Sequence, residues 1–426
     1  MASHMVGYVA KANKADEERD PSAKILKFVG KAGLEKYYND LLVGTPGVRT
    51  VLTNAYNREV AEINKTAASH NQDLRLALDT RLQQIADLAY EGQSGAIVVM
   101  DVQTGELLVA GSYPDFNISS FTQGISSTEW TALINDLMHP LTNKLTKGLY
   151  PPGSTIKPGM ALGFLRSGKI TPEWGVQDIG YIILGGRKFR DWKKDGHGYV
   201  SLRRGVQVSC DTYFYTGGSI VGIDELSRTM KFLGLGAKTG IDLPEESYGV
   251  VPDPAWKKKR LKQPWYAGDT LNTVIGQGNF LATPLQIANY TAFLASGTHR
   301  EPRLALSIGN KKIVSKELAH LSAQDDHHLQ MIRLGMYDVC NEPGGTAYRT
   351  LSNLPIKVAG KTGTAQVVGI SQAEKVRMKE SQYQYFQRSH AWVTSYARVD
   401  IPGYLSEGLV GVGVIGGARS ARGVIQ

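Results

Sequence analysis

A serine and a lysine stand three residues apart at Ser154 and Lys157, in the segment Tyr150-Pro-Pro-Gly-Ser-Thr-Ile-Lys. On a helix, residues with this spacing share one face, so the lysine amine can reach the serine hydroxyl and take its proton. The prolines and the glycine predict a sharp turn into a buried helix that starts around Ser154. One interpretation is a serine nucleophile activated by an amine. The other is a serine that caps the helix beside a solvated lysine.

Two later segments carry residue types that also suit acyl transfer. Ser209-Cys210-Asp211 lies 52 residues after Lys157 and precedes an aromatic run, so we expect it on a loop between helices. Lys361-Thr362-Gly363-Thr364 opens a predicted strand, and its glycine would let the backbone come close to a bound ligand. A hydroxyl, a carboxylate and a second amine could therefore surround Ser154.

In this order and approximate spacing, the three segments resemble the motifs of the penicillin-recognising serine transferases, which include penicillin-binding proteins and class A β-lactamases. The resemblance implies that Ser154 is the nucleophile, Lys157 the general base and Ser209 a proton relay toward the leaving amine. The backbone N–H groups of Ser154 and Thr364 would form the oxyanion hole. Substrate or drug would be bound by the third segment, through Lys361, Thr362, Gly363 and Thr364.

Two features of these motifs need separate interpretation. Asp211 stands where the wider superfamily usually has asparagine, and an ionised carboxylate accepts hydrogen bonds but does not donate them, which puts its contact with a substrate amide in question. We still count Asp211 with the catalytic residues, together with Lys361. A second Lys-Thr-Gly occurs at 238–240, but it leads into Ile-Asp-Leu-Pro and is interpreted as a structural segment.

Further segments narrow the family. Arg190-Asp-Trp-Lys-Lys, Lys262-Gln-Pro-Trp-Tyr-Ala-Gly-Asp and Gly33-Leu-Glu-Lys-Tyr-Tyr are similar to segments of class B penicillin-binding proteins of the rod-elongation machinery. This resemblance implies a peptidoglycan DD-transpeptidase that cross-links stem peptides in cell elongation and shape maintenance, and that β-lactams acylate at Ser154. The alternatives are a DD-carboxypeptidase and a β-lactam-binding sensor or scaffold. A class A β-lactamase is disfavoured because no Glu-x-x-Leu-Asn lies between Asp211 and Lys361.

The same resemblance implies partners and a compartment. The chain would be the periplasmic domain of an inner-membrane-anchored protein. Its partners would be peptidoglycan stem peptides, β-lactam antibiotics, a membrane glycosyltransferase and scaffold proteins of the elongation complex. The net charge is +9, but the basic clusters are short and no nucleic-acid-binding signature accompanies them, so we expect no nucleic acid as a partner. No run of about 18 apolar residues occurs in the sequence.

Four residues between the first motif and the middle of the second offer zinc-binding atoms: Asp178, Asp191, His197 and Cys210. The chemistry itself would require no cofactor. A structural Zn²⁺ held by these residues would pin the loop around His197 to the middle motif and so position Ser209. Alternatively, His197 is a surface-loop residue and Cys210 a small buried hydrophobe.

The elements that must position these residues are strands at both ends of a domain with helices between them. Strands are predicted at 96–101, 106–111, 358–368, 390–399 and 408–415. A helix capped by Asp79 or Thr80 precedes the first of them. This order implies an α+β domain with a five-stranded antiparallel sheet flanked by helices, which is the penicillin-binding protein/β-lactamase-like transpeptidase fold.

The length of 426 residues exceeds one average domain, and the polar, tyrosine-rich beginning of the chain changes in character near Leu74. We therefore expect a cloning remnant at 1–5, a truncated non-catalytic pedestal region at 6–73 and the transpeptidase domain at 74–426.

Overall fold

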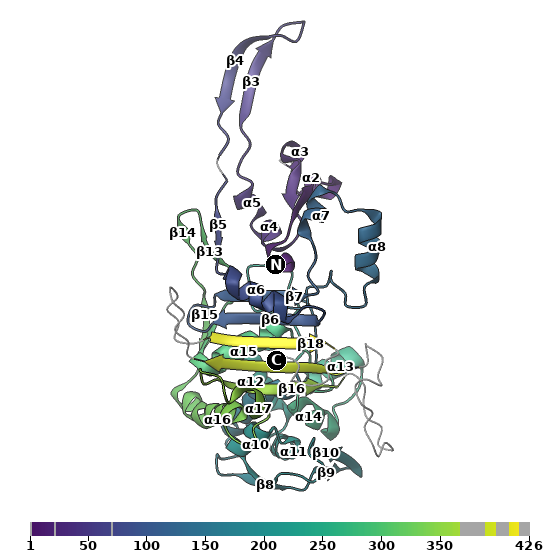
Figure 1. Cartoon of the computed structure of the whole chain (residues 1–426), viewed down its shortest axis with the longest axis vertical. Coiled ribbons are helices and arrows are strands. Elements are labelled where there is room, and N and C mark those ends of the chain that lie inside the picture. Colours follow the sequence, from purple (N-terminus) through teal and green to yellow (C-terminus); the bar gives the residue numbers. More distant parts are fainter. Residues whose placement is uncertain (1, 21–22, 70, 367–387, 398–408, 417–426) are drawn as a thin grey trace.

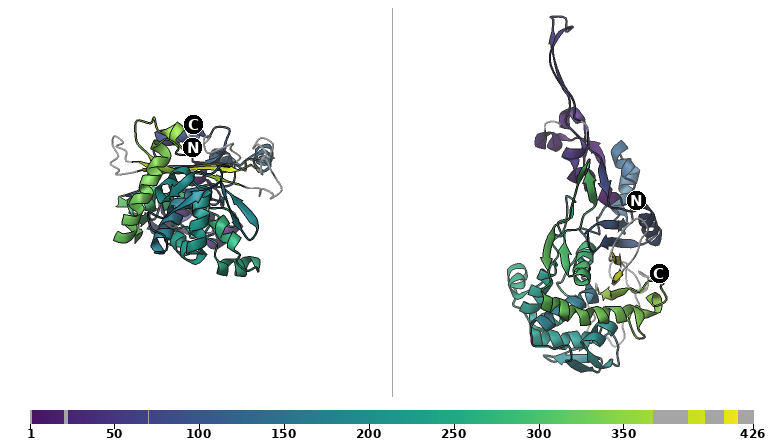
Figure 2. Two further views of the ribbon diagram at one scale, coloured as in Figure 1. Left: turned by 90° about the horizontal axis from the view of Figure 1, so that it is seen from below. Right: turned by 90° about the vertical axis from the view of Figure 1, so that its left-hand side faces the viewer.

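The computed structural model describes residues 2–20, 23–69, 71–366, 388–397 and 409–416, with side chains described as far as residue 397. A slender N-terminal region stands on a larger mixed domain (Figure 1). Figure 2 shows from the side that the molecule is elongated along the line that joins the two. No helix in the described part of the chain is long and apolar enough to cross a membrane.

The larger domain is built on an antiparallel sheet of five strands in the order β16-β17-β18-β6-β7. The strands are β6 Ser94–Asp101, β7 Leu107–Tyr113, β16 Ala359–Ala365, β17 His390–Ala397 and β18 Leu409–Gly416. β18 pairs with β6, so strands from the two ends of the domain lie side by side. The predicted α+β fold is confirmed. Val368, Val399 and Gly408, which the sequence assigned to strand ends, lie outside the described residues.

Most helices of the larger domain lie between β7 and β16. They are α7 Ile118–Gln123, α8 Ser127–Asn135, the 3₁₀ turn η1 Gly153–Ile156, α9 Lys157–Arg166, α10 Leu202–Val208, α11 Asp211–Val221, α12 Ile223–Phe232, α13 Pro254–Leu261, α14 Ala267–Val274, α15 Pro284–Ser296, α16 Ala323–Asn341 and α17 Tyr348–Leu351. α15 packs across β17, β18 and β6, and α16 packs against β16. Seen from below, most of these helices gather to one side of the sheet (Figure 2).

The central helix α15 shows why the sequence folds this way. Its residues from Pro284 to Leu294 are all buried, as expected of a helix that is apolar on nearly every side. The Thr283 hydroxyl accepts the N–H of Gln286, and the Gln286 side chain accepts the N–H of Thr283. This reciprocal cap satisfies two backbone donors at a helix start that lies away from water.

Four small sheets complete the larger domain. β8 Gly175–Asp178 pairs with β11 Gly198–Ser201, and β9 Tyr181–Leu184 pairs with β10 Arg187–Arg190. β12 Thr298–Arg300 pairs with β15 Glu317–His320, while β13 Ala305–Ile308 lies between β14 Lys311–Lys312 and β5 Leu74–Leu76. The helix α6 Thr80–Ala89 follows β5 in the chain. Its N-cap is Asp79, whose side chain accepts the N–H groups of Arg81 and Leu82.

The N-terminal region consists of short elements and one long hairpin. Its elements are α1 Ser3–Val6, β1 Val9–Lys11, α2 Lys14–Arg19, α3 Ala23–Leu26, β2 Phe28–Gly30, α4 Gly33–Tyr37, α5 Asn39–Leu42, β3 Val48–Thr53 and β4 Glu59–Thr66. The β3–β4 hairpin is almost wholly exposed and projects away from the rest of the molecule (Figure 1).

Two kinds of contact join the N-terminal region to the larger domain. Met5 and Leu34 are buried within the same apolar cluster as the core of that domain. The Tyr38 hydroxyl donates to Asp242 at 3.0 Å. Residues 2–6, part of which the sequence analysis assigned to a cloning remnant, are therefore packed into the fold.

Candidate active site

Ser154 lies in a tight turn at the start of a buried helix. η1 leads directly into α9, and Pro158 occupies the first turn of α9, where its missing N–H costs no hydrogen bond. Gly153 has a φ of 55°, a left-handed conformation that favours glycine, and its N–H donates to Gly276 O at 2.9 Å. The helix start expected near Ser154 is present, in the form of a 3₁₀ turn that continues as an α-helix.

Lys157 joins the first motif to the middle one. Its side chain is fully buried. Lys157 Nζ lies 2.6 Å from Asp211 Oδ1, 2.8 Å from Ser209 O and 3.2 Å from Ser209 Oγ. An ammonium group donates three hydrogen bonds, and these three acceptors match that capacity. A buried lysine is stable as a cation only when it is paired in this way.

The contact with Lys157 fits the chemistry of an aspartate at position 211. A carboxylate only accepts hydrogen bonds and an ammonium group only donates them, so the two groups form a charge-assisted pair. An asparagine amide would bring a neutral acceptor and two N–H groups to the same place. An ionised carboxylate only accepts hydrogen bonds. This property put a contact between Asp211 and a substrate amide in question, but it suits the contact between Asp211 and Lys157.

The third motif lies on β16, next to the turn that carries Ser154. Lys361 is fully buried, and its Nζ donates to Thr362 O at 2.9 Å. Burial, and then repulsion by Lys157, hold the pKa of Lys361 well below its usual range, with Asp211 acting in the opposite direction. Thr362 Oγ1 lies 2.6 Å from Thr346 Oγ1, while the side chain of Thr364 is exposed.

Gly363 has a role in packing that the sequence analysis did not anticipate. A Cβ at this position would lie 3.0 Å from Thr155 Cγ2 and 3.1 Å from Pro152 O. The glycine therefore lets β16 press directly against η1. We expected it to admit a ligand; the structure shows that it also admits the turn of the first motif.

The backbone of the middle motif sends its three side chains in two directions. Ser209 ends α10 in a left-handed conformation with φ 57°, and Cys210 caps α11, its Sγ accepting the N–H of Tyr213 at 3.3 Å. Ser209 and Asp211 contact Lys157, whereas Cys210 Sγ lies 3.4 Å from Asp178 Oδ2. The expected position, on a loop between helices, is observed.

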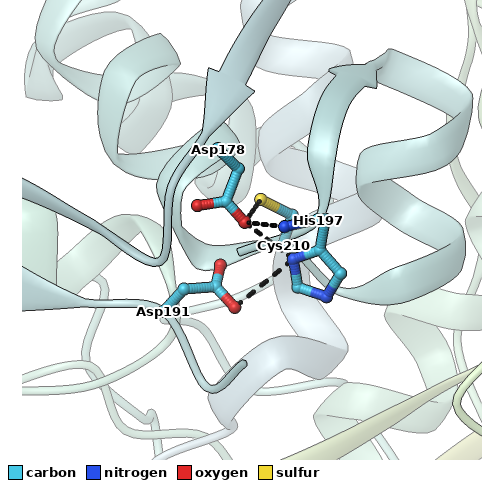
Figure 3. A group of neighbouring side chains, drawn as sticks. All are labelled: Asp178, Asp191, His197 and Cys210. Atoms are coloured by element: carbon cyan, nitrogen blue, oxygen red, sulfur yellow. Dashed lines mark hydrogen bonds and ion pairs between the residues drawn. The ribbon is translucent and has the colours of Figure 1, made fainter. Parts of the chain in front are cut away.

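Asp178, Asp191, His197 and Cys210 come together beside the middle motif (Figure 3). Pairing of β8 with β11 places Asp178 opposite Gly198 and so brings it next to His197. His197 Nδ1 lies 2.7 Å from Asp178 Oδ2 and 3.5 Å from Asp191 Oδ1. One potential ligand atom from each of the four residues lies within 4.8 Å of all the others.

This cluster, which we call the thiol–carboxylate cluster, suits a tetrahedral zinc ion. Bonds of about 2.0 Å to nitrogen or oxygen and 2.3 Å to sulfur separate neighbouring ligand atoms by roughly 3.3 to 3.8 Å. The Cys210–Asp178 and His197–Asp191 distances of 3.4 and 3.5 Å fall in that range, and the 2.7 Å contact would have to lengthen. His197 Nε2 is buried without a partner among the described residues, so Nδ1 is the nitrogen that faces the other ligands.

The electrostatics of the thiol–carboxylate cluster also leave room for a cation. Burial, together with the nearby Asp191, raises the pKa of the Cys210 thiol. Burial and the charge of Asp211 raise the pKa of Asp191. Burial would raise the pKa of Asp178 as well, but hydrogen bonds from Gly180 and His197 outweigh it and lower that pKa. Within the described residues, neither carboxylate forms a salt bridge with a lysine or an arginine.

Sequence reasoning missed two residues that support the turn of the first motif. The Tyr290 hydroxyl accepts the N–H of Gly159 at 2.7 Å and donates to Ile156 O at 3.3 Å. Trp392 Nε1 donates to Pro151 O at 3.1 Å. Both come from elements that are distant in sequence, and an aromatic residue on an apolar element gives no sign of such a contact. They hold η1 between α15 and β17.

The second Lys-Thr-Gly segment lies in a different setting. The N–H of Thr239 donates to Glu246 Oε1 at 2.7 Å. Two residues after the segment, Asp242 accepts the N–H groups of Leu304 and Ala305. The segment is therefore part of the support beneath the N-terminal region, because Asp242 also receives the Tyr38 hydroxyl.

Comparison with known protein families agrees with this geometry. Residues 95–410 match the model of the penicillin-binding protein transpeptidase domain. The chain belongs to this family. Residues 1–76 match the model of the penicillin-binding protein dimerisation domain. The fold and motifs expected from the resemblance thus correspond to a penicillin-binding protein with an N-terminal domain of its own.

Individual relatives place this penicillin-binding protein more narrowly. The chain is 39% identical to the peptidoglycan D,D-transpeptidase MrdA of Acinetobacter baumannii, with 94% of this chain and 60% of the relative covered. It is 38% identical to MrdA of Escherichia coli K12, with 94% and 65% covered. The chain therefore spans less than two thirds of the length of these relatives.

Solved structures give the same placement. A complex between penicillin-binding protein PBP2 and MreC from Helicobacter pylori matches with a TM-score of 0.89 and 42% identity, over 99% of this chain and 75% of that one. Pseudomonas aeruginosa PBP2 in complex with WCK 5153 matches with a TM-score of 0.85 and 33% identity, over 99% and 85%. The chain is a penicillin-binding protein of the PBP2 type.

Proposed function

We propose that this chain is the catalytic part of a peptidoglycan DD-transpeptidase that forms an acyl-enzyme on Ser154 during cell elongation. The observation that carries the proposal is the set of contacts from Lys157 Nζ to Ser209 and Asp211, made at the start of the helix that follows the Ser154 turn. Lys157 and Lys361 are fully buried, Ser154 is half-buried, and the turn η1 that carries Ser154 packs against the strand β16 that carries Lys361. This is the inventory needed for nucleophilic attack with proton transfer.

In the first step, Ser154 Oγ attacks the carbonyl carbon of the penultimate D-alanine of a donor stem peptide. Lys157 accepts the hydroxyl proton. Because Lys157 now donates to three acceptors, it must first release a proton, and the nearest acceptor is Asp211 at 2.6 Å. The backbone N–H groups of Ser154 and Thr364 stabilise the oxyanion, an interaction that is typically worth about 3 to 4 kcal/mol for each donor.

The tetrahedral intermediate then collapses. The carbon–nitrogen bond breaks, Ser209 relays a proton to the leaving amine, and D-alanine departs. In the second step, an acceptor amine attacks the ester carbonyl and gives a proton to Lys157. The ester carbon–oxygen bond then breaks as Lys157 returns that proton to Ser154 Oγ, which releases the cross-linked product. Lys361, Thr362 and Thr364 hold the terminal carboxylate of the donor, and Gly363 keeps their strand against the Ser154 turn. A β-lactam follows the first step and leaves a stable ester on Ser154.

The two alternative functions predict different products from one experiment. We would supply uncross-linked peptidoglycan polymer, digest it with a muramidase and identify the products by mass. A transpeptidase gives cross-linked dimers, whereas a DD-carboxypeptidase gives trimmed monomers. A sensor or scaffold produces neither dimers nor trimmed monomers but still forms a β-lactam adduct. Ser154→Ala should abolish dimers, and dimers that persist in that variant would exclude Ser154 as the nucleophile.

We further propose that the thiol–carboxylate cluster holds a structural Zn²⁺ through Asp178, Asp191, His197 and Cys210. When bound, the ion supplies no chemistry to the reaction; it ties β8 and the loop around His197 to the middle motif. Cys210 lies between Ser209 and Asp211, so fixing its side chain also fixes the two neighbours that contact Lys157.

The setting of the protein is also a proposal. By analogy with its relatives, the chain would be the periplasmic part of an inner-membrane-anchored protein, with residues 6–73 as a pedestal and 74–426 as the catalytic domain. Scaffold and glycosyltransferase partners are supported by two similar structures, the PBP2–MreC complex and a peptidoglycan synthase complex that coordinates polymerisation and crosslinking. Co-purification of the full-length protein with such partners would test this.

A further inference from the structure

The helix α13 carries a row of four exposed cations. Lys258, Lys259, Arg260 and Lys262 are all exposed, in its last turns and at its C-cap. Among the described residues, none of the four forms a salt bridge, whereas Lys231, Lys257, Arg203 and Arg333 all do. Lys258, Lys259 and Lys262 line an open hollow of about 560 Å³.

A second group of cations lies on β10. Arg187 and Arg190 have exposed side chains. The ring of Phe189, between them, lies 3.4 Å from the position that a Cβ on Gly268 would occupy, so β10 touches the start of α14. α14 begins five residues after Lys262, and the two groups therefore flank its N-terminal end. We call the four exposed cations of α13, together with Arg187 and Arg190 of β10, the basic rim.

Three contacts fix the basic rim relative to Ser154. Lys257, the buried lysine of α13, pairs with Asp269 of α14 at 2.6 Å. At the other end of α14, Gly276 O accepts the N–H of Gly153, and Gln277 Nε2 donates to Thr364 O at 3.2 Å. Eight helical residues span about 12 Å. The helix α14 therefore connects the basic rim, near its first residues, with the Ser154 turn, near its last residues.

We propose that the basic rim binds the anionic stem peptides of the peptidoglycan strand that is being cross-linked, outside the site that holds the reacting donor end. This inference rests on the proposed transpeptidase function. A strand carries many stem peptides with free carboxylates, and only one of them reacts at a time. Exposed cations at a fixed distance from Ser154 attract the neighbouring carboxylates and raise the local concentration of the polymer.

The exposed aromatic residue Tyr266 supports a sugar-peptide polymer as the ligand. Its side chain is 59% exposed next to Asp269, and Lys257 Nζ lies 4.6 Å from its ring centre. An exposed ring held rigidly among cations offers a flat apolar surface to a sugar or peptide, which a purely ionic surface lacks. An anionic lipid surface would need no fixed distance from the active site, and we therefore favour the polymer.

The test compares two variants of the full chain with equal loss of charge. The first replaces Lys258, Lys259, Arg260 and Lys262 with glutamine. The control replaces Lys65, Arg75, Lys311 and Lys312, which are exposed on β4, β5 and β14, away from α13 (Figure 1). Co-sedimentation with purified uncross-linked peptidoglycan at low salt should fall about tenfold for the first variant and less than twofold for the control.

Two further measurements separate the possible failures. β-Lactam acylation of Ser154 should proceed at the native rate in both variants, because the rim does not contact the reacting atoms. If acylation occurs but the rim variant sediments like the native protein or like the control, the inference is wrong and the proposed function stands. If only binding to vesicles of anionic phospholipid is lost, the rim is a lipid site and the inference is again wrong. If native protein forms no adduct, the proposed function itself fails.

Discussion

Two buried polar clusters share the Ser209–Asp211 segment, and they differ in charge. On one side, Lys157 and Lys361 face a single carboxylate, Asp211. On the other side, Asp178 and Asp191 face an imidazole and a thiol whose pKa is raised, mainly by burial. Two amines therefore face one carboxylate in the catalytic cluster, whereas two carboxylates face one imidazole in the thiol–carboxylate cluster.

The difference suggests a division of labour. We propose that the amines near Ser154 favour an anionic donor peptide and a developing oxyanion. The buried carboxylates around Cys210 are neutralised either by protons or by a cation, and the proposed divalent ion would fill the second role. Because Cys210 stands between Ser209 and Asp211, a change in the second cluster reaches the first through one peptide segment.

The largest expected effect comes from removing the cation of the catalytic cluster. Lys157→Ala should lower the rate of acylation by a β-lactam by about 10² to 10⁴, because Ser154 loses its base and Asp211 its partner. Stopped-flow or mass measurements on folded protein report the rate. Lys144→Ala is the matched control, since Lys144 is also buried and burial lowers its pKa to about 8. Equal losses in both variants would reduce the effect to general destabilisation.

The second prediction concerns the thiol–carboxylate cluster. The purified protein should hold one zinc ion, and a chelator should lower its Tm by about 3 to 6 °C. An ion that is present at a concentration well above its Kd stabilises the folded protein by a few kcal/mol, and chelation removes this contribution. Cys210→Ser should hold less zinc and respond less to the chelator. Cys340→Ser should respond like the native protein, because Cys340 is equally buried but lies outside the cluster.

Metal analysis can break this part of the comparison. Native protein without zinc, and with a Tm that does not respond to chelation, would leave the four residues as a hydrogen-bonded cluster. The proposed link between the clusters through a bound ion would then fail as well. In that case Cys210→Ser should change neither zinc content nor acylation.

A smaller effect should appear in the pH dependence of stability. The pKa of Lys361 is lowered by burial and by Lys157, so above its folded pKa the amine is neutral in the folded protein and protonated in the unfolded one. The unfolded state then binds more protons, and the free energy of unfolding rises with pH up to the unfolded pKa, by at most about 1.4 kcal/mol per pH unit. Lys361→Met should flatten this rise in denaturant titrations between pH 7 and 9.

The sign of that change is the informative part. A free energy of unfolding that depends on pH equally in the native protein and in Lys361→Met would mean that Lys361 keeps its proton in the folded state. The catalytic cluster would then carry an excess of positive charge.

The smallest expected effect comes from a hydrogen bond outside both clusters. Tyr38→Phe removes the hydroxyl that donates to Asp242 and should lower the free energy of unfolding by about 1 kcal/mol. Tyr37→Phe, at the neighbouring and half-exposed position, should change it by less than about 0.5 kcal/mol. Neither should alter acylation. If Tyr38→Phe slows acylation, the N-terminal region is coupled to the active site through Asp242.

The sequence predicted the parts of the molecule that carry strong local patterns. The five strands of the main sheet, the cap at Asp79 and the helix after Ser154 all follow from periodicity and from the placement of proline and glycine. The sequence also predicted that Asp178, Asp191, His197 and Cys210 lie together, and the structure brings them together, although their spacing is irregular. Their binding of zinc stays a prediction.

The rest depended on contacts between distant segments. Strands such as β8 and β11 are four residues long and largely exposed or half-buried, so they show no clear alternation. The hydrogen bonds from Tyr290 to Gly159 and Ile156 join residues more than 130 positions apart. The packing of Gly363 against Thr155 is equally invisible in either segment alone. Local patterns predict elements, but the support of the Ser154 turn arises only when the elements meet.

The most direct test of the account is the intact mass of the protein after incubation with a β-lactam. We predict a stable one-to-one adduct on the native chain and none on a folded Ser154→Ala variant. An unmodified native protein, or an adduct that survives in Ser154→Ala, would contradict the assignment of Ser154 as the nucleophile.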